Sequence, residues 1–359
     1  MDTLTHALSG ALAGRLLAGR TGHAGSPPAP PVWQVVVAGA AAATFPDIDF
    51  VLGFVSELTY LRGHRGVTHS LLLLPLWGLL VAWVMARLLR LRRGGRPAPG
   101  WRAFYLVACV GILVHILGDL ITQFGTMILA PFSDRRFAWG TTFIIDLVFS
   151  AIIVAGLAAS AVWRDSRVPA ALASLALVGW VGLSAVARTE ALAVARAHAA
   201  EHAIPAVAVD AVPRPASPFN WTAIVFDGER YHYAHINTRR RAPLAAGESD
   251  HFIRRLSAQY LPVAMAHWQT AARFGGRDHS PLAQAAWAAA EFEFFRWFAM
   301  FPVLDRVEAD GDGVCVNFRD LRFETPGRPD IPFRYGVCAG EKGWRLFERL
   351  GSGLRRVVN

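Results

Sequence analysis

Eight histidine and aspartate side chains lie at or near the ends of apolar runs in the N-terminal half of the chain. Imidazole and carboxylate groups are costly to bury in a membrane, and where they occur there they usually serve a function. They occur in the stretches MDTLTHALSG, FPDIDF, HRGVTHS, HILGD and FIIDLVF. The residues are His6, Asp47, Asp49, His64, His69, His115, Asp119 and Asp146.

The types and spacing of these residues favour a metal site. His115 and Asp119 are four residues apart, so their side chains share one face of a helix and can reach a common ion. Asp47 and Asp49 flank Ile48, and in an extended segment both carboxylates would point to the same side. Imidazole and carboxylate together suit a divalent metal such as zinc, and also manganese or iron. Because eight candidate ligands exceed one tetrahedral site, a centre of two ions is compatible with the sequence.

Each pattern also has an ordinary structural explanation. A single histidine at a span boundary, such as His6, is usually an interfacial hydrogen-bonding group. A His–Asp pair at helical spacing often only braces its helix. The DID segment would equally well cap the following helix, and Asp146 would pair with Arg135 or Arg136. The combination of eight residues, and not any one motif, favours a shared metal centre.

Long apolar runs must position these residues. Of the 359 residues 53% are hydrophobic, and the excess before residue 190 predicts a membrane-embedded half followed by a more ordinary domain. A helix that crosses a bilayer needs about 20 mostly apolar residues. Four runs qualify, namely Val67–Ala86, Phe104–Leu120, Phe143–Trp163 and Val168–Ala187. Two shorter runs, Leu4–Leu17 and Val32–Phe45, are separated by the helix-breaking linker RTGHAGSPPAPP. The sequence predicts an all-α polytopic membrane domain over residues 1–188, with about four to six membrane helices.

Arginine placement predicts which side of the membrane each loop faces. Cytoplasmic loops carry an excess of positive residues. Six arginines lie in RLLRLRRGGRPAPGWR, which separates the runs Val67–Ala86 and Phe104–Leu120. If every run crosses once, ten arginines fall on the cytoplasmic side, and Arg62, Arg65, Arg135 and Arg136 fall on the other. All eight candidate ligands then lie at the outer face of an inner membrane. Everything after about residue 188 also lies outside the cytoplasm.

The remainder of the chain predicts a small α+β domain. Residues 189–218 hold a polar helix, Glu190–His202, and the linker AVPRPASP, and the domain follows over residues 219–359. WTAIVFDGERYHYAHI predicts a hairpin with Asp227-Gly228 as its turn. We expect helices at His251–Phe274 and Pro281–Phe301. The aromatic stretch EFEFFRWFAMF in the second would lie on a bilayer or pack on the domain's own strands. Short strands are expected near Val314–Phe318, Phe333–Cys338 and Trp344–Glu348.

The cysteines and the net charge add little on function. Three cysteines are too few for a disulfide framework. Cys109 lies in an apolar run and is expected to be a small core residue. Cys315 and Cys338 would pair in an oxidising compartment and would otherwise be buried free thiols. The net charge of +9 is not accompanied by a basic–aromatic surface pattern, so nucleic acid is not an expected partner. A cleavable signal peptide is not expected, because Asp2 and His6 replace its basic region.

The motifs, taken in order, carry a family resemblance. TH near the start, then FPDID, HRGVTHS, HILGDLITQFGT and PFS, resemble the YdjM-type family of membrane-bound metal-dependent hydrolases over about residues 1–150. The resemblance implies a polytopic inner-membrane protein. Carried over by motif, it implies a metal set of His6, Asp47, Asp49, His64, His69, His115 and Asp119. HILGD also has a fainter likeness to the zinc-dependent phospholipase C and single-strand nuclease superfamily, which hints at phosphoester hydrolysis. The amino-terminal Trp ligand of those enzymes is not present here.

These observations predict a membrane-embedded hydrolase. It would use metal-activated water on a phosphoester or ester bond of a lipid or lipid-linked substrate at the outer membrane face. Arg65, and Arg135 or Arg136, would hold an anionic substrate or stabilise the charge of the transition state. Asp49, or Asp47, would act as general base.

Two other functional classes stay open. Intramembrane histidine and aspartate residues also build metal or proton transporters, although the inner halves of the apolar runs carry no matching residues. A structural or sensory membrane protein would use the metal only to hold helices together. A metal site that is open to water favours the enzyme, and one closed by protein ligands favours the structural role.

Overall fold

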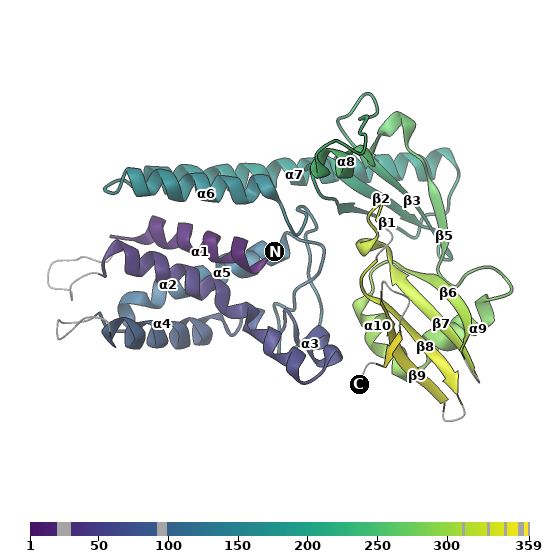
Figure 1. Cartoon of the computed structure of the whole chain (residues 1–359), viewed down its shortest axis with the longest axis horizontal. Helices are drawn as coiled ribbons and strands as arrows, with labels where there is room; N and C mark the ends of the chain where they lie inside the picture. Colours follow the sequence, from purple (N-terminus) through teal and green to yellow (C-terminus); the bar gives the residue numbers. More distant parts are fainter. Residues whose placement is uncertain are drawn as a thin grey trace. The chain divides into compact units, whose positions relative to one another are not determined.

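The computed structural model describes residues 1–19, 30–91, 99–310, 313–328, 331–340, 343–350 and 355–357. The chain forms two compact units: Met1–Val55 with Thr59–Ser184, and Ser56–Leu58 with Ala185–Asn359 (Figure 1). Most of the linker RTGHAGSPPAPP and the centre of the arginine-rich loop lie outside the described residues. Arg20, Arg92, Arg93 and Arg96, four of the arginines that predict sidedness, also lie outside them.

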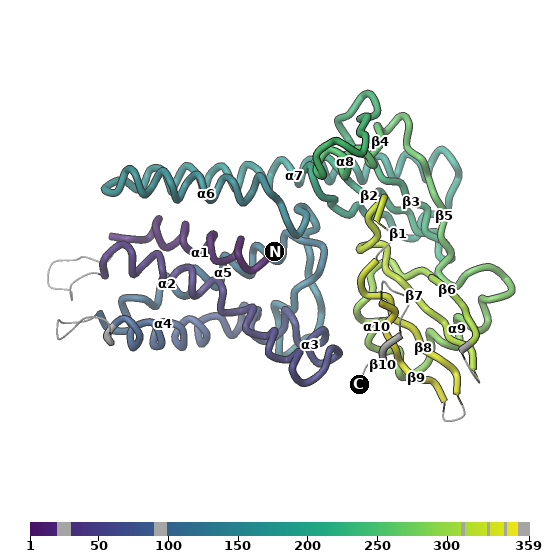
Figure 2. The backbone as a smooth tube through the Cα atoms, viewed as in Figure 1, coloured from purple at the N-terminus to yellow at the C-terminus, as the bar shows by residue number. Residues whose placement is uncertain are grey.

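The first unit is helical, and its path is followed in Figure 2. Its helices are α1 Thr3–Leu17, α2 Val32–Thr44, α3 Glu57–Gly63, α4 Leu74–Leu91, α5 Arg102–Leu120 and α6 Leu147–Val162, with 3-10 segments η1 Phe45–Phe54 and η2 Val67–His69. The helix α7, Val168–Glu201, begins in this unit and continues into the second. Phe104, Ile112 and Ile116 of α5 are fully buried in a cluster that also contains side chains of α2 and α4. The helix α5 is therefore packed at the centre of this unit.

Glycine residues allow α1, α2 and α5 to approach closely. A Cβ atom at Gly10 of α1 would lie 2.2 Å from the carbonyl oxygen of Gly39 in α2. A Cβ at Gly14 would lie 2.5 Å from the carbonyl oxygen of Val35, and one at Gly111 of α5 would lie 2.8 Å from that of Gly39. Gly10 and Gly14 are four residues apart, the spacing with which small residues line close helix contacts in membranes. These contacts bring the start of α1, the end of α2 and the end of α5 together.

Three helices are long and apolar enough to cross a membrane among the described residues: Val32–Phe54, counted through η1, then α5 and α7. A fourth span results if the segments Glu57–His69 and Leu74–Leu89, which meet at an angle of 85°, count as one. The helix α6 is apolar but shorter. These observations support a helical membrane part with three or four crossing helices, at or just below the lower limit of the four to six expected.

Several expected boundaries differ from the structure. The run Val67–Ala86 was expected to be one helix, but η2 and the turn at Ser70–Leu73 precede α4. In the run expected at Phe143–Trp163 the helix begins at Leu147 and not at Phe143, because Asp146 caps its first turn. The polar helix Glu190–His202 is not separate, because α7 continues through Glu201. At 34 residues, α7 is about 51 Å long, which exceeds the roughly 30 Å hydrocarbon core of a bilayer.

The segment that carries Asp47 and Asp49 is a 3-10 helix, so the expectation of an extended stretch was wrong. Pro46 stands at the first turn of η1, where its missing amide hydrogen leaves no helical hydrogen bond unmade. A 3-10 helix has three residues per turn, so residues two apart point in different directions. Asp47 and Asp49 therefore do not share one side, and each contacts a different group.

The second unit contains two five-stranded sheets. The first has β1 Ala208–Pro213, β2 Asn220–Phe226, β3 Arg230–Asn237 and β4 Leu261–Pro262 in spatial order, with β5 Gln269–Ala272 paired to β3. The second is antiparallel, in the order β10 Arg355–Val357, β9 Gly343–Arg349, β8 Arg334–Gly340, β7 Gly313–Asp320 and β6 Pro302–Asp310. Alanines of α7 at four-residue spacing pack on Trp221 and Ala223 of β2. The arrangement is consistent with the expected α+β domain.

The hairpin expected at residues 221–236 is confirmed as β2 and β3, with Gly228 in the turn at a φ of +107°. The three strands expected near the C-terminus are confirmed as β7, β8 and β9. The helix expected at His251–Phe274 is wrong beyond Ala258, because only α8 Phe252–Ala258 is helical and β4 and β5 follow. The second expected helix is broken into α9 Ser280–Ala288, η4 Ala290–Phe292 and α10 Glu293–Phe298.

The aromatic residues of η4 and α10 lie in the interior of the second unit. Phe292, Phe294, Phe295 and Phe298 are buried, and rings of this group contact Phe318 of β7 and Tyr335 of β8. Of the two uses expected for this stretch, packing on the domain's own strands is the one observed.

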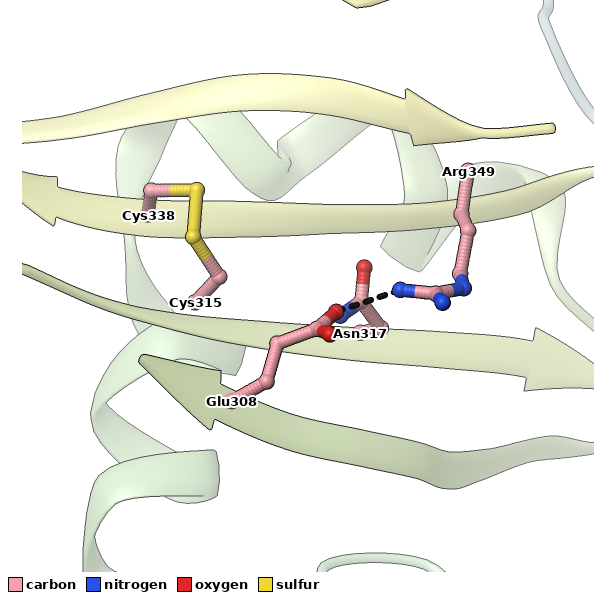
Figure 3. The surroundings of a disulfide bond; sticks show 5 residues. All are labelled: Glu308, Cys315, Asn317, Cys338 and Arg349. Carbon is pink, nitrogen blue, oxygen red and sulfur yellow. Dashed lines mark hydrogen bonds and ion pairs between the residues drawn. A yellow bond between two sulfur atoms is a disulfide. The ribbon is translucent and has the colours of Figure 1, made fainter. Parts of the chain in front are cut away.

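Cys315 of β7 stands directly opposite Cys338 of β8, and the two form a disulfide bond (Figure 3). Farther along these strands, Glu308 of β6 accepts hydrogen bonds from Asn317 and Arg349, so side-chain contacts join four neighbouring strands (Figure 3). Of the two states left open by the sequence, the structure contains the paired one.

Candidate metal centre

Three side chains form the buried centre of the cluster. His115 and Asp119 lie on one face of α5, as the four-residue spacing predicts, and His69 comes from η2. His69 and His115 are 0% exposed and Asp119 is 1% exposed. Polar side chains buried this deeply must be satisfied by partners or by an ion.

Hydrogen bonds fix how the two imidazoles point. His115 Nδ1 donates to the carbonyl oxygen of Ala43 at 2.6 Å, so the neutral ring carries its lone pair on Nε2. His69 Nδ1 lies 3.0 Å from Thr68 Oγ1 and 3.6 Å from Asp49 Oδ2. Both Nε2 atoms face the same point and are 2.9 Å apart. A second partner that fixes the ring is typical of histidines that bind metal.

The ligand atoms have the separations of a tetrahedral site. His115 Nε2 lies 3.5 Å from Asp119 Oδ2 and 3.6 Å from Asp47 Oδ1. His69 Nε2 lies 3.2 Å from Asp119 Oδ2. Zinc bonds of about 2.0–2.1 Å at tetrahedral angles place ligand atoms about 3.3 Å apart. His69, His115 and Asp119 therefore fit one divalent ion, and Asp47 is a further candidate ligand through its contact with His115.

An unsatisfied oxygen points to the same position. Asp119 Oδ2 is buried and accepts no hydrogen bond from the described residues, although two imidazole nitrogens lie within 3.5 Å of it. An unpartnered carboxylate oxygen in an apolar interior is costly. Coordination of a cation between these three atoms would satisfy the oxygen and both lone pairs.

The other oxygen of Asp119 lies among donors. Asp119 Oδ1 accepts from the amino group of Met1, lies 2.9 Å from Arg65 Nη2 and 3.1 Å from His6 Nε2. The ring of His6 also stacks on that of His115, with centroids 3.6 Å apart. These contacts compensate the buried charge of Asp119 and hold its carboxylate in one orientation.

The net charge of the cluster favours a cation. Three carboxylates, those of Asp47, Asp49 and Asp119, lie against two cationic groups, the guanidinium of Arg65 and the amino terminus. With neutral imidazoles one negative charge is in excess, and a divalent ion would offset it.

Asp49 and His64 lie beside the centre. Asp49 Oδ1 lies 3.0 Å from His64 Nδ1, and Asp49 Oδ2 accepts from the backbone amide of Arg65 at 2.9 Å. Both oxygens of Asp49 are therefore engaged. Neither Asp49 nor His64 belongs to a group of three ligand atoms close enough to hold an ion, among the residues that the structure describes. Both were expected to be ligands, and the geometry gives Asp49 the position of an orienting carboxylate.

The structure describes one ion position. The two groups with mutually close ligand atoms are His6, His115, Asp119 and Asp47, His69, His115, and His115 is common to both. Because Nδ1 of His115 donates to Ala43, only its Nε2 could bind an ion, so the two groups would share a single ion. A second ion would have to use Asp47 or Asp119 without His115.

Arg65 is buried and does not lie at the surface. Its side chain is 3% exposed, its Nη1 donates to Thr122 Oγ1 at 3.0 Å, and its guanidinium lies over the ring of Phe124. The backbone φ of Arg65 is +59°, in the left-handed region that non-glycine residues rarely adopt. This conformation allows the amide of Arg65 to reach Asp49 while its side chain reaches Asp119. The strain is thus located at the candidate site.

Three further residues named from the sequence lie outside the cluster. Arg135 is exposed and lies over the ring of Phe137, and Arg136 donates to the carbonyl oxygen of Phe124. Asp146 caps α6 through the amides of Val148 and Phe149 and accepts from Trp180 Nε1 at 2.9 Å.

Several contacts of the cluster were not predicted. They come from the amino group of Met1, the hydroxyls of Thr3, Thr68 and Thr122, and the carbonyl of Ala43. The sequence offers one signal for such contacts, a threonine immediately before His6 (Thr5) and before His69 (Thr68). Of these two, only Thr68 contacts the histidine that follows it through its side chain. The others depend on helix packing, which the motif spacing does not contain.

Comparison with known proteins finds a family match over the first unit. The family model described as YdjM inner membrane protein matches residues 1–191. A protein of Bacillus subtilis (strain 168), described as uncharacterized protein YfhP, is 29% identical over 169 residues, which is 47% of this chain. The matched part spans 48% of that relative's length. No solved structure matches the chain.

Proposed function

The chain belongs to the YdjM family of inner membrane proteins, and from this premise we propose that its buried His–Asp cluster is the active site of a metal-dependent hydrolase. The observation that carries the proposal is the convergence of His69 Nε2, His115 Nε2 and Asp119 Oδ2, with separations of 2.9–3.5 Å. A divalent ion held there by these three side chains, most simply zinc, would lower the pKa of water and would polarise a phosphoryl or carbonyl group.

Different residues of the cluster would bind the ion, orient its ligands and accept a proton. His69, His115 and Asp119 would hold the ion, and Asp49 orients His69 and His64 from behind. Asp47 lies at the edge of the cluster with 16% of its side chain exposed, so it either completes the coordination or takes a proton from the attacking water. We assign the role of general base to Asp47 and not to Asp49, because both oxygens of Asp49 are engaged.

Arg65 acts on Asp119 in this proposal. Because its guanidinium is buried against Asp119 Oδ1, Arg65 positions that carboxylate and offsets its charge. We assign the binding of an anionic substrate to Arg135 instead, because the side chain of Arg135 is exposed.

The apolar surface of η1 supports a lipid or lipid-linked substrate. Ile48, Phe50 and Phe54 on the segment that carries Asp47 and Asp49 are exposed, Phe54 by 85%. Exposed aromatic and aliphatic side chains next to a polar centre are typical of segments at a membrane boundary. A substrate with a phosphoester or ester head group and an acyl or prenyl body could approach the centre along this segment, at the outer membrane face.

A structural metal is the second candidate, and one observation favours it. If Asp47, whose Oδ1 lies 3.6 Å from His115 Nε2, coordinates together with His69, His115 and Asp119, four protein atoms would fill a tetrahedral site, as in closed structural zinc centres. The two functions therefore differ in whether Asp47 is a ligand.

One experiment tests the proposal and separates it from the alternative. The full chain, purified from membranes, is assayed for bound metal and for hydrolysis of bis(4-nitrophenyl) phosphate, a phosphatidic acid and a 4-nitrophenyl acyl ester, with and without chelator. We expect one zinc-like ion and chelator-sensitive hydrolysis, both lost in His115→Ala. His267→Ala, which replaces an exposed histidine, is the matched control. Bound metal without hydrolysis in any arm would favour the structural role, and an absence of metal would refute the metal centre.

A further inference from the structure

A cavity in the second unit is lined by cationic and aromatic side chains, and its residues have no part in the metal centre. Its volume is about 260 Å³, and Tyr231, Arg273, Trp287 and Arg296 contribute to its wall. The apolar part of the wall comes from Ile224, Phe226, Met300 and Phe301. The cavity thus combines an apolar surface with a few polar groups, which is the composition of a ligand site.

The guanidinium of Arg273 is held in place but has no anionic partner. It lies over the rings of Phe274 and Trp287, at 5.1 and 4.9 Å from their centroids. Its Nε is buried and forms no hydrogen bond, and no carboxylate pairs with it, among the described residues. Stacking on aromatic faces fixes the plane of the guanidinium and leaves its edge free to donate, which is the geometry that recognises phosphate and carboxylate.

Two further groups of the wall can donate to the same ligand. Arg296 donates to the carbonyl oxygens of Trp287 and Ala289, and it has no acidic partner in the described part of the chain. The hydroxyl of Tyr231 forms no hydrogen bond with a described residue. Burial raises the pKa of Tyr231 to about 12, despite the opposing charge of Arg273, so its hydroxyl keeps its proton and can donate.

One acidic residue also lines the cavity, and it is already compensated. Asp210 forms an ion pair with Arg188 and accepts from the backbone amide of Ala211. The charge that is not compensated within the cavity is therefore positive, carried by Arg273 and Arg296.

We propose that this cavity binds a small amphipathic anion, a phosphate or carboxylate group attached to an apolar body. The anionic group would accept from Arg273 and Tyr231, and the apolar body would lie on Trp287 and Phe301. The volume is below the roughly 300–1,000 Å³ of sites for drug-sized ligands, so the ligand is small or only its end is enclosed. The inference does not depend on the metal centre.

The test uses the full chain in lipid nanodiscs and 4-fluorobenzylphosphonate as the probe, observed by fluorine NMR. A phosphonate is not cleaved by a phosphoester hydrolase, and chelator is present throughout, so failure of the proposed hydrolase would leave this result unaffected. We expect saturable binding beyond that to empty nanodiscs. Inorganic phosphate and neutral 4-fluorobenzyl alcohol should each compete at least tenfold more weakly than unlabelled benzylphosphonate.

Variants locate the site. Arg273→Gln should weaken binding at least about tenfold, because it removes a charge-assisted hydrogen bond, and Arg273→Lys should weaken it less. Tyr231→Phe, which keeps the ring, should weaken it a few fold. Arg255→Gln replaces an exposed arginine of α8 and should have no effect. Non-saturable binding, equal competition by phosphate or by the alcohol, or unchanged binding in both Arg273→Gln and Tyr231→Phe would overturn the proposal.

Discussion

Besides the hydroxyl of Thr68, which lies 3.5 Å from Oδ2, Asp49 contacts three groups through its two carboxylate oxygens. It lies against His64 Nδ1, the backbone amide of Arg65 and the Nδ1 atom of His69. A carboxylate behind a metal-binding histidine fixes the ring and raises its basicity. Asp49 is therefore expected to adjust metal affinity from outside the coordination shell.

Replacing Asp49 should weaken metal binding without abolishing it. In Asp49→Asn we expect metal affinity to fall by about 10–100-fold, the usual effect of removing such a partner, and in His115→Ala to be lost. Competition with a fluorescent zinc chelator measures both. If Asp49→Asn lost as much affinity as His115→Ala, Asp49 would be a direct ligand.

His235 should make the stability of the second unit depend on pH. Burial, with the nearby charge of Arg214, lowers the pKa of His235 from 6.5 to about 3 in the folded chain, and Nδ1 lies 2.9 Å from Thr222 Oγ1. Between pH 3 and 6.5 the unfolded chain binds a proton that the folded chain does not. The contribution to stability is therefore complete above pH 6.5 and is lost as pH falls, with a slope of up to about 1.4 kcal/mol per pH unit.

Hydrogen exchange of the β2 and β3 amides in the full chain, corrected for intrinsic rates, measures this dependence. His235→Asn keeps a hydrogen-bonding group near Thr222 and should have a smaller slope between pH 4 and 6. His267→Asn, at an exposed position, should behave as the natural chain does. Equal slopes for all three proteins would contradict the assignment to His235.

The direction of a single side chain was predictable where the periodicity of its own helix or strand determines it. The positions of His115 and Asp119 follow from helical spacing alone, and both lie in the cluster. The different directions of Asp47 and Asp49 did not follow, because their pattern suits both an extended segment and a 3-10 helix. The contacts of Met1 and Thr3 with residues 118 and 44 positions away arise only from tertiary packing.

At the scale of elements, the glycine contacts between α1 and α2 control the geometry of the centre. The two backbones touch at Gly10 and Gly39, one helical turn from the ends that carry His6 and Thr44. Backbone atoms on both sides of the contact cannot rotate away, so an added methyl group must separate the helices.

Gly39→Ala should therefore destabilise the first unit and reduce its metal content. The new Cβ would lie 2.2 Å from the carbonyl oxygen of Gly10, and overpacking of this kind typically costs about 1–3 kcal/mol. Gly179→Ala in α7 is the matched control, since no atom lies within 4 Å of its Cβ. Thermal unfolding in detergent and metal analysis measure both effects. Equal behaviour of the two variants would show that the contact is not tight.

Elements with one clear signal were predictable, and those with competing signals were not. The hairpin β2–β3 has alternating residues and an Asp-Gly turn, and it forms as expected. The segment after Ala258 has helix-compatible residues, yet it pairs with β3 as β4 and β5 because an edge of that sheet is available. Helix and strand propensities of the segment itself give no information on whether β3 is available to pair with it.

At the scale of the molecule, the distribution of arginine predicts that the C-terminal unit lies outside the cytoplasm. The disulfide Cys315–Cys338 agrees with that placement, because such bonds persist in oxidising compartments. Alkaline phosphatase fused after Asn359 should be active in cells, and green fluorescent protein fused there should be dark. Fusions after Leu91, in the loop between α4 and α5, should give the opposite result. A cytoplasmic C-terminus would invert the topology and the predicted outer location of the centre.

The division into a helical unit and a strand-rich unit follows from the fall in apolar content near residue 190, which the sequence displays directly. The number of crossing helices does not follow from the sequence, because α1 and α6, with 15 and 16 residues, fall just short of the length of a span. The 85° bend before α4 likewise lies beside long-range contacts, those of Arg65 with Asp49 and Met127 and that of the Leu71 amide with the carbonyl oxygen of Ile128.

The ligands of the centre come from segments that leave the ribosome at different times. His69 is made before the others, and the centre cannot be completed until Asp119 has followed 50 residues later. Because metal binding and folding are coupled when the ligands are far apart in the chain, metal capture would mark the end of insertion. Chains made during metal starvation would stay loosely assembled and open to membrane proteases, so the cellular amount of this protein would follow the supply of its metal.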